Sequence, residues 1–395
     1  MNKNLGIYVH IPFCKSKCYY CDFCSREIDS NSEDGHISDY VDAICAEILN
    51  NVEILSERGI SSIYFGGGTP SYIKEEYIGK IMNLLSNFIC RNFDNESIEC
   101  TIELNPADVT EEKLKKYSDM GFNRFSLGLQ SINDETLKKI GRRHTKQGVE
   151  SALNNFKKAG INNVSLDIIT GLPGETEEMF KKTLDYIVSI KGWDIVKHIS
   201  IYSLELHKDT QLGFLVSENM ISLPSEDDER NMKHMADKVL RENGFNMYEI
   251  SNYSIKGYES KHNLNYWECG EYIGFGVAAS SYINSTRYSN TNNINEYISN
   301  IKTKNSIILE KDELDKLGLM KEFIILNLRL NKGVIFSRFK EIFNTDIFSL
   351  FNIEISKNIS NKLLIYIKDD KANICGMRLT DRGRDLANQV WQSFI

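Results

Sequence analysis

The chain has 395 residues, with 47 basic and 55 acidic side chains and a formal net charge of −8 at pH 7. This length allows one large domain with one or two smaller ones. The acidic balance, without a sustained block of Lys and Arg, argues against a broad nucleic-acid surface. The sequence shows neither a secretory leader nor an apolar run of about 18 residues, so we expect a cytoplasmic protein that does not cross a membrane.

Three cysteines near the N-terminus, Cys14, Cys18 and Cys21, are separated by three and then two residues. Three thiolates cannot complete a tetrahedral zinc site, which takes four ligands. They suit a [4Fe–4S] cluster, because three thiolates leave one iron open to a small molecule. Cys24 could complete a zinc site or close the open iron if the loop bent, but we interpret it as a packed residue. An odd count of nine cysteines does not suggest a disulfide framework.

Strands and helices alternate along the first half of the chain. Residues 5–10 read as a buried strand that leads into the cysteine loop, and Ser38 is a plausible cap for a helix over 38–58. The strand at 60–65 leads into a turn of three glycines, Thr69 and a proline, where the backbone can pass close to a ligand. Further strands are predicted at 97–104, 123–130, 163–169 and 197–204, separated by helices at 75–91, 113–120, from 133, at 146–159 and at 175–190.

Six strands with long crossovers predict an α/β fold, a parallel sheet curled into a partial (β/α)6 barrel. In such barrels the functional groups gather at the C-terminal ends of the strands. The cysteine loop and the Gly-rich turn fall at such ends. Glu103, Gln130 and Asp167 lie at or near the ends of later strands, so we expect all of these features to face one mouth.

The pattern changes in the last part of the chain to short helices and a hairpin, after a strand predicted at 248–251. This predicts a small α+β, winged-helix-like domain, which we interpret as a lid or docking surface because no basic recognition helix is evident. The expected domains are a barrel at 1–210, an extension at 211–290 and the small domain at 291–395. Within the small domain, helices are predicted at 314–328 and 334–343, a hairpin at 363–368 and 372–379, and a last helix from Thr380 to 394.

Taken together, these motifs resemble the radical S-adenosylmethionine (SAM) superfamily. Within it they resemble the anaerobic coproporphyrinogen III dehydrogenase (oxygen-independent oxidase) family, and most closely its haem chaperone branch. The resemblance extends over most of the chain. It is carried by residues 8–14, 21–23, 65–71, 126–131, 141–142, 167–173, 248–251, 262–267, 377–380 and 382–383.

The resemblance implies a TIM-like radical-SAM barrel in which the three cysteines hold a [4Fe–4S] cluster and the open iron binds SAM. It also implies a haem-binding HNxxYW motif at residues 262–267, which makes His262 the leading haem-ligand candidate. The family commonly has a His near Ser280, and this chain departs from that pattern. The implied SAM contacts are Tyr8, Tyr20, Gly67, Gly68, Thr69, Glu103, Gln130, Arg142 and Asp167, of which Arg142 suits a carboxylate and Asp167 suits ribose hydroxyls.

The favoured function is a cytoplasmic haem chaperone that passes haem to an acceptor protein of unknown identity, which could be membrane-associated. The alternative is an oxygen-independent coproporphyrinogen III oxidase of porphyrin biosynthesis. That enzyme carries a long N-terminal segment and a further cysteine two residues after the third, whereas here thirteen residues precede Cys14 and position 23 is Phe. A nucleic-acid-modifying radical-SAM enzyme is a third hypothesis, disfavoured because no basic appended domain is evident.

Overall fold

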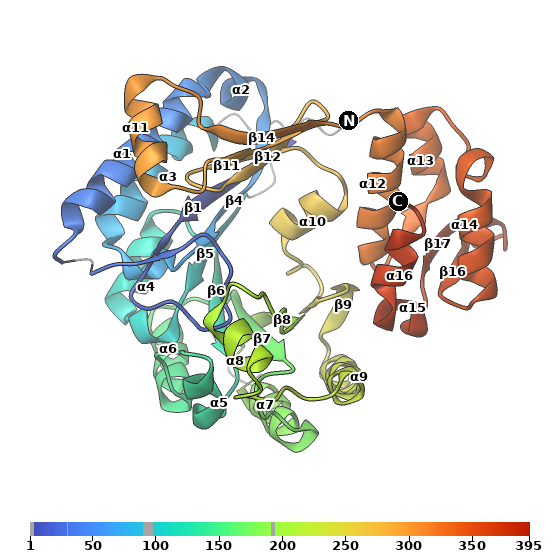
Figure 1. Cartoon of the computed structure of the whole chain (residues 1–395), viewed down its shortest axis with the longest axis horizontal. Helices are drawn as coiled ribbons and strands as arrows, with labels where there is room; N and C mark the ends of the chain where they lie inside the picture. The colour runs from blue at the N-terminus through green and yellow to red at the C-terminus, as the bar shows by residue number, and fades with distance from the viewer. Residues whose placement is uncertain (1–3, 30, 90–97, 191–193) are drawn as a thin grey trace.

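The computed structural model describes residues 4–29, 31–89, 98–190 and 194–395 (Figure 1). The six predicted strands are present and pair in parallel, which confirms the α/β fold with a partial (β/α)6 barrel. Their side chains are buried on both faces, as a parallel sheet covered by helices requires. The strands are β1 (Asn4–Ile11), β4 (Gly59–Gly67), β5 (Glu99–Leu104), β6 (Arg124–Gln130), β7 (Val164–Thr170) and β8 (Val196–Ser203).

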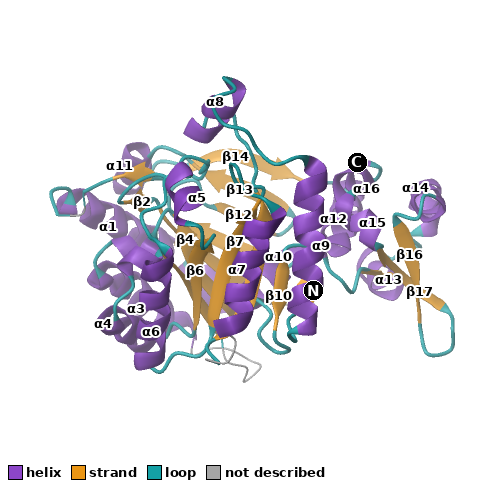
Figure 2. Cartoon of the chain, turned by 90° about the horizontal axis from the view of Figure 1, so that it is seen from below, coloured by secondary structure: helices purple, strands orange, loops and turns teal. Residues whose placement is uncertain are grey.

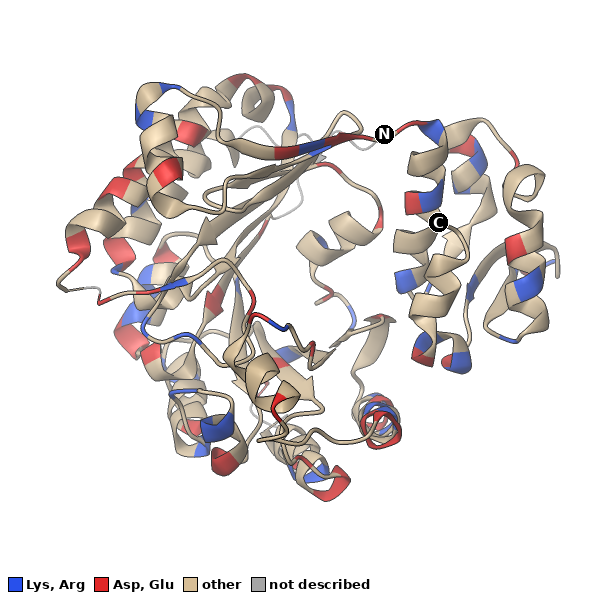
Figure 3. Cartoon of the chain, viewed as in Figure 1, with Lys and Arg blue, Asp and Glu red and all other residues tan. Residues whose placement is uncertain are grey.

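Helices cover the outside of this sheet, with charged residues of both signs on their outer faces (Figures 2 and 3). Thr110, Asn133 and Thr145 each accept a backbone hydrogen bond and cap a helix in the manner their residue types favour. Every helix within the described residues is too short or too polar to cross a bilayer. The outer helices are α1 (Asp34–Asn50), α2 (Val52–Glu57), α3 (Glu75–Ile89), α4 (Glu111–Asp119), α5 (Asp134–Lys139), α6 (Lys146–Lys158) and α7 (Glu177–Ile190), with short turns η1 (Pro70–Tyr72) and η2 (Pro106–Asp108).

The helix predicted over 38–58 is wrong in two respects. It begins earlier, at Asp34, and Ser38 therefore lies inside α1 rather than at its cap. The chain also leaves helical geometry at Asn51, whose side chain donates to the carbonyl of Glu47 at 2.8 Å and ends α1. Two helices therefore stand where one was predicted. The predicted end of α3 and the predicted start of β5 lie outside the described residues.

The sheet continues further at both edges than the sequence predicted. β11 (Tyr272–Phe275) pairs in parallel with β1 on the side away from β4. β12 (Ser280–Ile283), β13 (Thr286–Asn290) and β14 (Ile308–Glu313) follow in antiparallel order, with α11 (Ile294–Thr303) between the last two. At the other edge, after α8 (Gln211–Ser217) and α9 (Glu226–Glu242), the strand expected at 248–251 is β9 (Asn246–Glu249). With β10 (Asn252–Ser254) the strand order is β14-β13-β12-β11-β1-β4-β5-β6-β7-β8-β10-β9.

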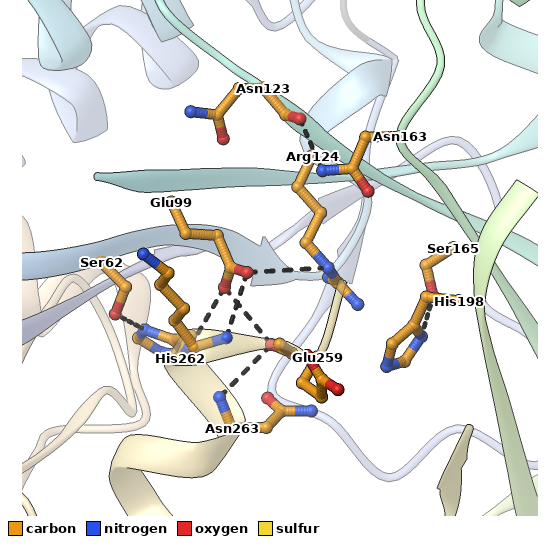
Figure 4. Close-up of polar contacts among 12 residues, drawn as sticks. Ser62, Glu99, Asn123, Arg124, Asn163, Ser165, His198, Glu259, His262 and Asn263 are labelled. Atoms are coloured by element: carbon orange, nitrogen blue, oxygen red, sulfur yellow. Dashed lines mark hydrogen bonds and ion pairs between the residues drawn. The ribbon is translucent and has the colours of Figure 1, made fainter. Parts of the chain in front are cut away.

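A short helix, α10 (Lys261–Trp267), lies in the space that the curved sheet encloses (Figure 1). The Glu99 carboxylate on β5 caps this helix by accepting from the backbone N–H groups of Lys261 and His262 at 3.0 and 3.1 Å (Figure 4). A carboxylate is favourable there because the helix N-terminus carries a partial positive charge. Arg124 lies 4.0 Å from the same carboxylate. The interior of the barrel is therefore polar, and it holds α10 in a fixed place.

The small domain has its own hydrophobic core and a three-stranded antiparallel sheet, as the predicted winged-helix-like domain requires. In contrast, α11 packs with the first core and β14 pairs with β13 at the edge of the large sheet. The division at 1–210, 211–290 and 291–395 stays a prediction, and we propose that the last boundary lies nearer residue 314. The domain contains α12 (Lys316–Arg329), β15 (Val334–Ile335), α13 (Phe336–Phe343), α14 (Phe348–Ser360), β16 (Leu364–Lys368), β17 (Ile374–Leu379), α15 (Asp381–Asp385) and α16 (Ala387–Gln392).

The small domain joins the sheet edge through backbone and side-chain contacts. The Ile250 N–H donates to the carbonyl of Arg329 at 3.1 Å, just beyond β9. The Arg329 guanidinium lies between two tryptophan rings, 4.2 Å from the centre of Trp267 on α10 and 5.0 Å from that of Trp391 on α16. Such cation–π contacts are strongest where water is excluded. The C-terminal end of α10 is thus tied to the small domain.

Phe323 tests how strongly the second core stabilises the small domain. Its ring is 2% exposed and packs edge-on against Phe339 and Phe343 at 5.8 and 5.7 Å. Phe323→Ala should lower the free energy of unfolding of the small domain by about 3–5 kcal/mol, because it leaves a cavity. The half-exposed Leu350 provides a control, and Leu350→Ala should change stability by less than about 0.5 kcal/mol. Denaturant unfolding followed by circular dichroism measures both, and equal effects would contradict a core role for Phe323.

Candidate functional site

The cysteine loop is held at the C-terminal end of β1 by the Gly-rich turn that follows β4. Backbone N–H groups of Gly68 and Thr69 donate to the carbonyls of Ile11 and Phe13 at 2.8 and 3.0 Å. A Cβ atom on Gly68 would lie 2.8 Å from the carbonyl carbon of Pro12, so only glycine allows this approach. A short pairing of β2 (Phe13–Cys14) with β3 (Arg26–Glu27) closes the loop.

The three predicted cluster ligands lie together in this loop. Cys14 is buried and its Sγ is 3.4 Å from Thr69 Oγ1, whereas Cys18 and Cys21 are partly exposed. Burial raises the pKa of the Cys14 thiol and raises that of Cys21 to about 11. Arg142 Nη1 donates to Cys18 Sγ at 3.6 Å, which places a guanidinium beside the cysteines.

The same thiols do not form a single-ion site. Among the described residues, no three His, Cys, Asp or Glu side chains converge on one point as ligands of one metal ion must. A cubane cluster imposes a different requirement, because each thiolate binds a different iron. Cys24 packs against the first core, and its Sγ donates to the Asn292 carbonyl at 3.4 Å. This contact favours the packed interpretation of Cys24.

Two partly buried carboxylates, Glu103 on β5 and Asp167 on β7, lie on strands that flank β6. Tyr64 OH donates to Glu103 Oε1 at 2.8 Å, and Ser126 Oγ donates to Asp167 Oδ2 at 2.7 Å. Burial raises the pKa of Asp167, and burial together with the negative charge of Asp167 raises the pKa of Glu103 to about 7. In the β5–β6–β7 register, Glu103 stands opposite Ser126, so the structure brings these predicted residues together.

Gln130 and Arg142 leave polar atoms available beside the cysteines. Gln130 follows a bulge in β6 and has a left-handed backbone, with φ of 61°. Arg142 Nη2 donates to the Gly128 carbonyl at 2.6 Å. Within the described part of the chain, Gln130 Oε1 and Arg142 Nε are buried without a hydrogen-bond partner. Buried polar atoms are normally paired, so these two fit a site that takes a polar ligand.

The remaining predicted SAM contacts, Tyr8, Gly67 and Tyr20, lie in different surroundings. Tyr8 OH is 3.1 Å from His10 Nδ1, and a Cβ atom on Gly67, whose φ is 107°, would come within 2.5 Å of the His10 ring. His10 therefore packs on the Gly-rich turn, a contact that sequence analysis did not assign. Tyr20 instead packs against the apolar cluster of Leu137, Ile140, Ile169 and Leu172.

A cavity of about 400 Å³ opens beside Tyr8 and His10. This volume falls within the range of small-molecule sites, and aromatic rings form much of its wall. Its lining comes from the cysteine loop, from α10 and the turn after it, from β11 to β13, and from α12. The lining residues are Tyr8, His10, Phe23, Cys24, Tyr266, Trp267, Cys269, Gly270, Tyr272, Ala278, Ser280, Tyr282, Arg287, Glu322 and Leu326.

His262, the predicted haem ligand, lies behind this wall. It is 2% exposed, and its Nδ1 lies 2.8 Å from Ser62 Oγ (Figure 4). Its Nε2 lies 2.8 Å from Tyr266 OH. Burial lowers its pKa to about 3, so the ring is neutral. Both ring nitrogens have partners, and ligation of iron would require the loss of one. Ser280, near which the family commonly has a His, does line the cavity.

Comparison with known proteins identifies the family. Residues 8–187 match the Radical SAM superfamily and residues 314–386 match the HemN C-terminal domain. The heme chaperone HemW of Lactococcus lactis is 34% identical, covering 100% of this chain and 98% of that protein. HemW of Bacillus subtilis is 32% identical, covering 98% of each.

A solved structure shares the fold of the whole chain. Coproporphyrinogen III oxidase (HemN) from Escherichia coli superposes with a TM-score of 0.82 at 21% identity, covering 100% of this chain and 90% of that one. At this identity the likeness shows the fold alone, whereas the identity to the chaperones extends over nearly the full length of both chains. The chain therefore belongs to the radical-SAM family of the heme chaperone HemW.

Proposed function

We propose that this protein binds haem in the cavity beside the cysteine loop and passes it to an acceptor protein. The observation that carries the proposal is that residues beside the three cysteines and residues of the HNxxYW segment line the same cavity. Phe23 and Cys24, which follow the three cysteines, line the same space as Tyr266 and Trp267 of the HNxxYW segment. Flat aromatic side chains suit the face of a porphyrin. We place the transfer in the cytoplasm, with an acceptor that could be membrane-associated.

The neighbouring face of the barrel would hold the cluster and SAM. Cys14, Cys18 and Cys21 would hold a [4Fe–4S] cluster, which together with SAM supplies one-electron chemistry when bound. The close approach of the Gly-rich turn leaves backbone groups near this site for an amino-acid moiety. The unpartnered Arg142 Nε and Gln130 Oε1 are available to the same ligand. The donor set fits the groups that the superfamily implies.

His262 has two roles that the geometry allows. It could ligate the haem iron after releasing Ser62 or Tyr266, or it could fix Tyr266, whose ring lines the cavity. The second role needs no rearrangement, so we favour it as a positioning role. The free thiol of Cys269 also lines the cavity, although burial raises its pKa to about 12 and keeps it protonated.

The alternative function is oxygen-independent oxidation of coproporphyrinogen III. The fold shared with HemN supports this alternative, and the cavity could accept a related tetrapyrrole. The higher identity to the heme chaperones supports the first proposal instead.

The cluster ligands can be tested by counting iron and sulfide after anaerobic reconstitution. Cys14→Ala, Cys18→Ala and Cys21→Ala should each lose most of the iron, because two thiolates do not retain a cubane. Cys24→Ala and Cys45→Ala are matched controls and should keep it, since both side chains pack against the first core. Iron loss in Cys24→Ala as large as that in Cys21→Ala would instead make Cys24 a ligand.

Haem titration separates the two roles of His262. If His262 positions Tyr266, then His262→Ala and Tyr266→Phe should weaken haem binding to a similar extent, about tenfold, because both remove the hydrogen bond between His262 and Tyr266. The haem absorption band should keep its wavelength and the cluster spectrum should not change. If His262 ligates the iron, the band should shift in His262→Ala, and Tyr266→Phe should bind haem almost as the wild type does.

A direct assay distinguishes the chaperone from the oxidase. Reconstituted protein with SAM, a reductant and coproporphyrinogen III should form no protoporphyrinogen beyond the level without protein. The same preparation loaded with haem should transfer it to an apo-haem protein, followed by the absorption of the acceptor. Repeated turnover of coproporphyrinogen would rule out our preferred function and establish the alternative.

A further inference from the structure

Two side chains of opposite formal charge line the cavity. They are Arg287 on β13 and Glu322 on α12, and among the described lining residues no other side chain is Arg, Lys, Asp or Glu. His10 also lines the cavity, but burial lowers its pKa and leaves it neutral. Burial raises the pKa of Cys24 and of Cys269, so these thiols are uncharged. Arg287 is therefore the one fixed cation of this lining.

Arg287 and Glu322 form an ion pair that joins the large sheet to the small domain. Arg287 Nη2 donates to Glu322 Oε1 at 2.5 Å, and β13 belongs to the large sheet whereas α12 belongs to the small domain. The guanidinium carbon lies 5.7 Å from the centre of the Tyr282 ring, which is part of the cavity wall. Arg287 is thus held in the cavity lining by contacts with the Tyr282 ring and the Glu322 carboxylate.

This ion pair is poorly explained by stability alone. The two side chains are 39% and 17% exposed, and ion pairs that reach solvent contribute little to folding. A guanidinium, however, presents two parallel donors that match any carboxylate, including one on a ligand. A ligand carboxylate that enters a largely apolar cavity needs such a counter-charge.

We propose that Arg287 binds a propionate carboxylate of the tetrapyrrole. When no ligand is bound, the Glu322 carboxylate takes the place of the propionate on Arg287. This inference rests on the proposed haem site and names the group of the ligand that is recognised there. Entry of the ligand exchanges the Glu322 carboxylate for a propionate, so the contact between α12 and β13 is released as the ligand binds. The same recognition would hold for any tetrapyrrole with free propionates.

Comparison of haem with its dimethyl ester tests the proposal, because esterification removes the negative charge of both propionates and adds only one methyl group to each. The wild-type protein should bind haem at least about tenfold more tightly than the ester, as expected for one charge-assisted contact. Arg287→Gln should remove this preference and leave the affinity for the ester unchanged. Arg287→Lys keeps the positive charge but not the two parallel N–H donors, so it should keep part of the preference that Arg287→Gln loses.

Glu322→Gln provides an independent test in the opposite direction. It removes the competing carboxylate, so haem should bind several-fold more tightly while ester binding stays the same. A purely structural ion pair would instead make both variants weaken both ligands. Arg241→Gln is the matched control, because it removes a comparable ion pair with Asp237 on α9, outside the cavity lining. It should change neither affinity.

The outcomes separate the two proposals. If the wild type binds neither haem nor its ester, the proposed haem site itself fails. If the wild type binds both equally, the haem site stands and recognition of the propionate is overturned. If haem is preferred over the ester but Arg287→Gln keeps that preference, a different residue recognises the carboxylate and our assignment of Arg287 is wrong.

Discussion

The contact between two loops at the ends of β1 and β4 is the constraint on which the site depends. The strands pair along their length, so that Ile11 stands beside Gly67 and the loops that follow must share the same space. Two backbone hydrogen bonds and the missing side chain of Gly68 make that possible. The cysteines are therefore fixed at the mouth of the barrel, while Tyr8 and His10 on the strand itself reach the adjoining cavity.

The polar interior of the barrel has a second role, which is to hold one wall of that cavity. Glu99 would be costly to bury alone, but it accepts two N–H groups at the start of α10 and lies near Arg124. The helix in turn places Tyr266 and Trp267 against the cavity. Glu103 lies on the same face of β5 as Glu99. Tyr64, which donates to Glu103, stacks on His262 of α10, so the carboxylates and the aromatic wall adjoin inside the barrel.

Much of this arrangement follows from the sequence, because the predicted parallel strands come with amphipathic helices long enough to show their period. The C-terminal ends of parallel strands lie at one edge of the sheet. The cysteine loop, the Gly-rich turn and Glu103 could therefore be placed together from the sequence. β11 and α10 could not be found in this way, since they are short and depend on partners distant in the chain. Nor could sequence tell that His262 faces Ser62 rather than the cavity, because the direction of a side chain on a short helix depends on what that helix packs against.

The placement of Arg329 between Trp267 and Trp391 has an optical consequence. These are two of the three tryptophans in the chain, and they sit on opposite sides of the joint between the cores. Indole emission depends on nearby charge and solvent, so a rearrangement at that joint should change the emission of both tryptophans. Tryptophan fluorescence should therefore report the approach and separation of the two cores without an attached dye.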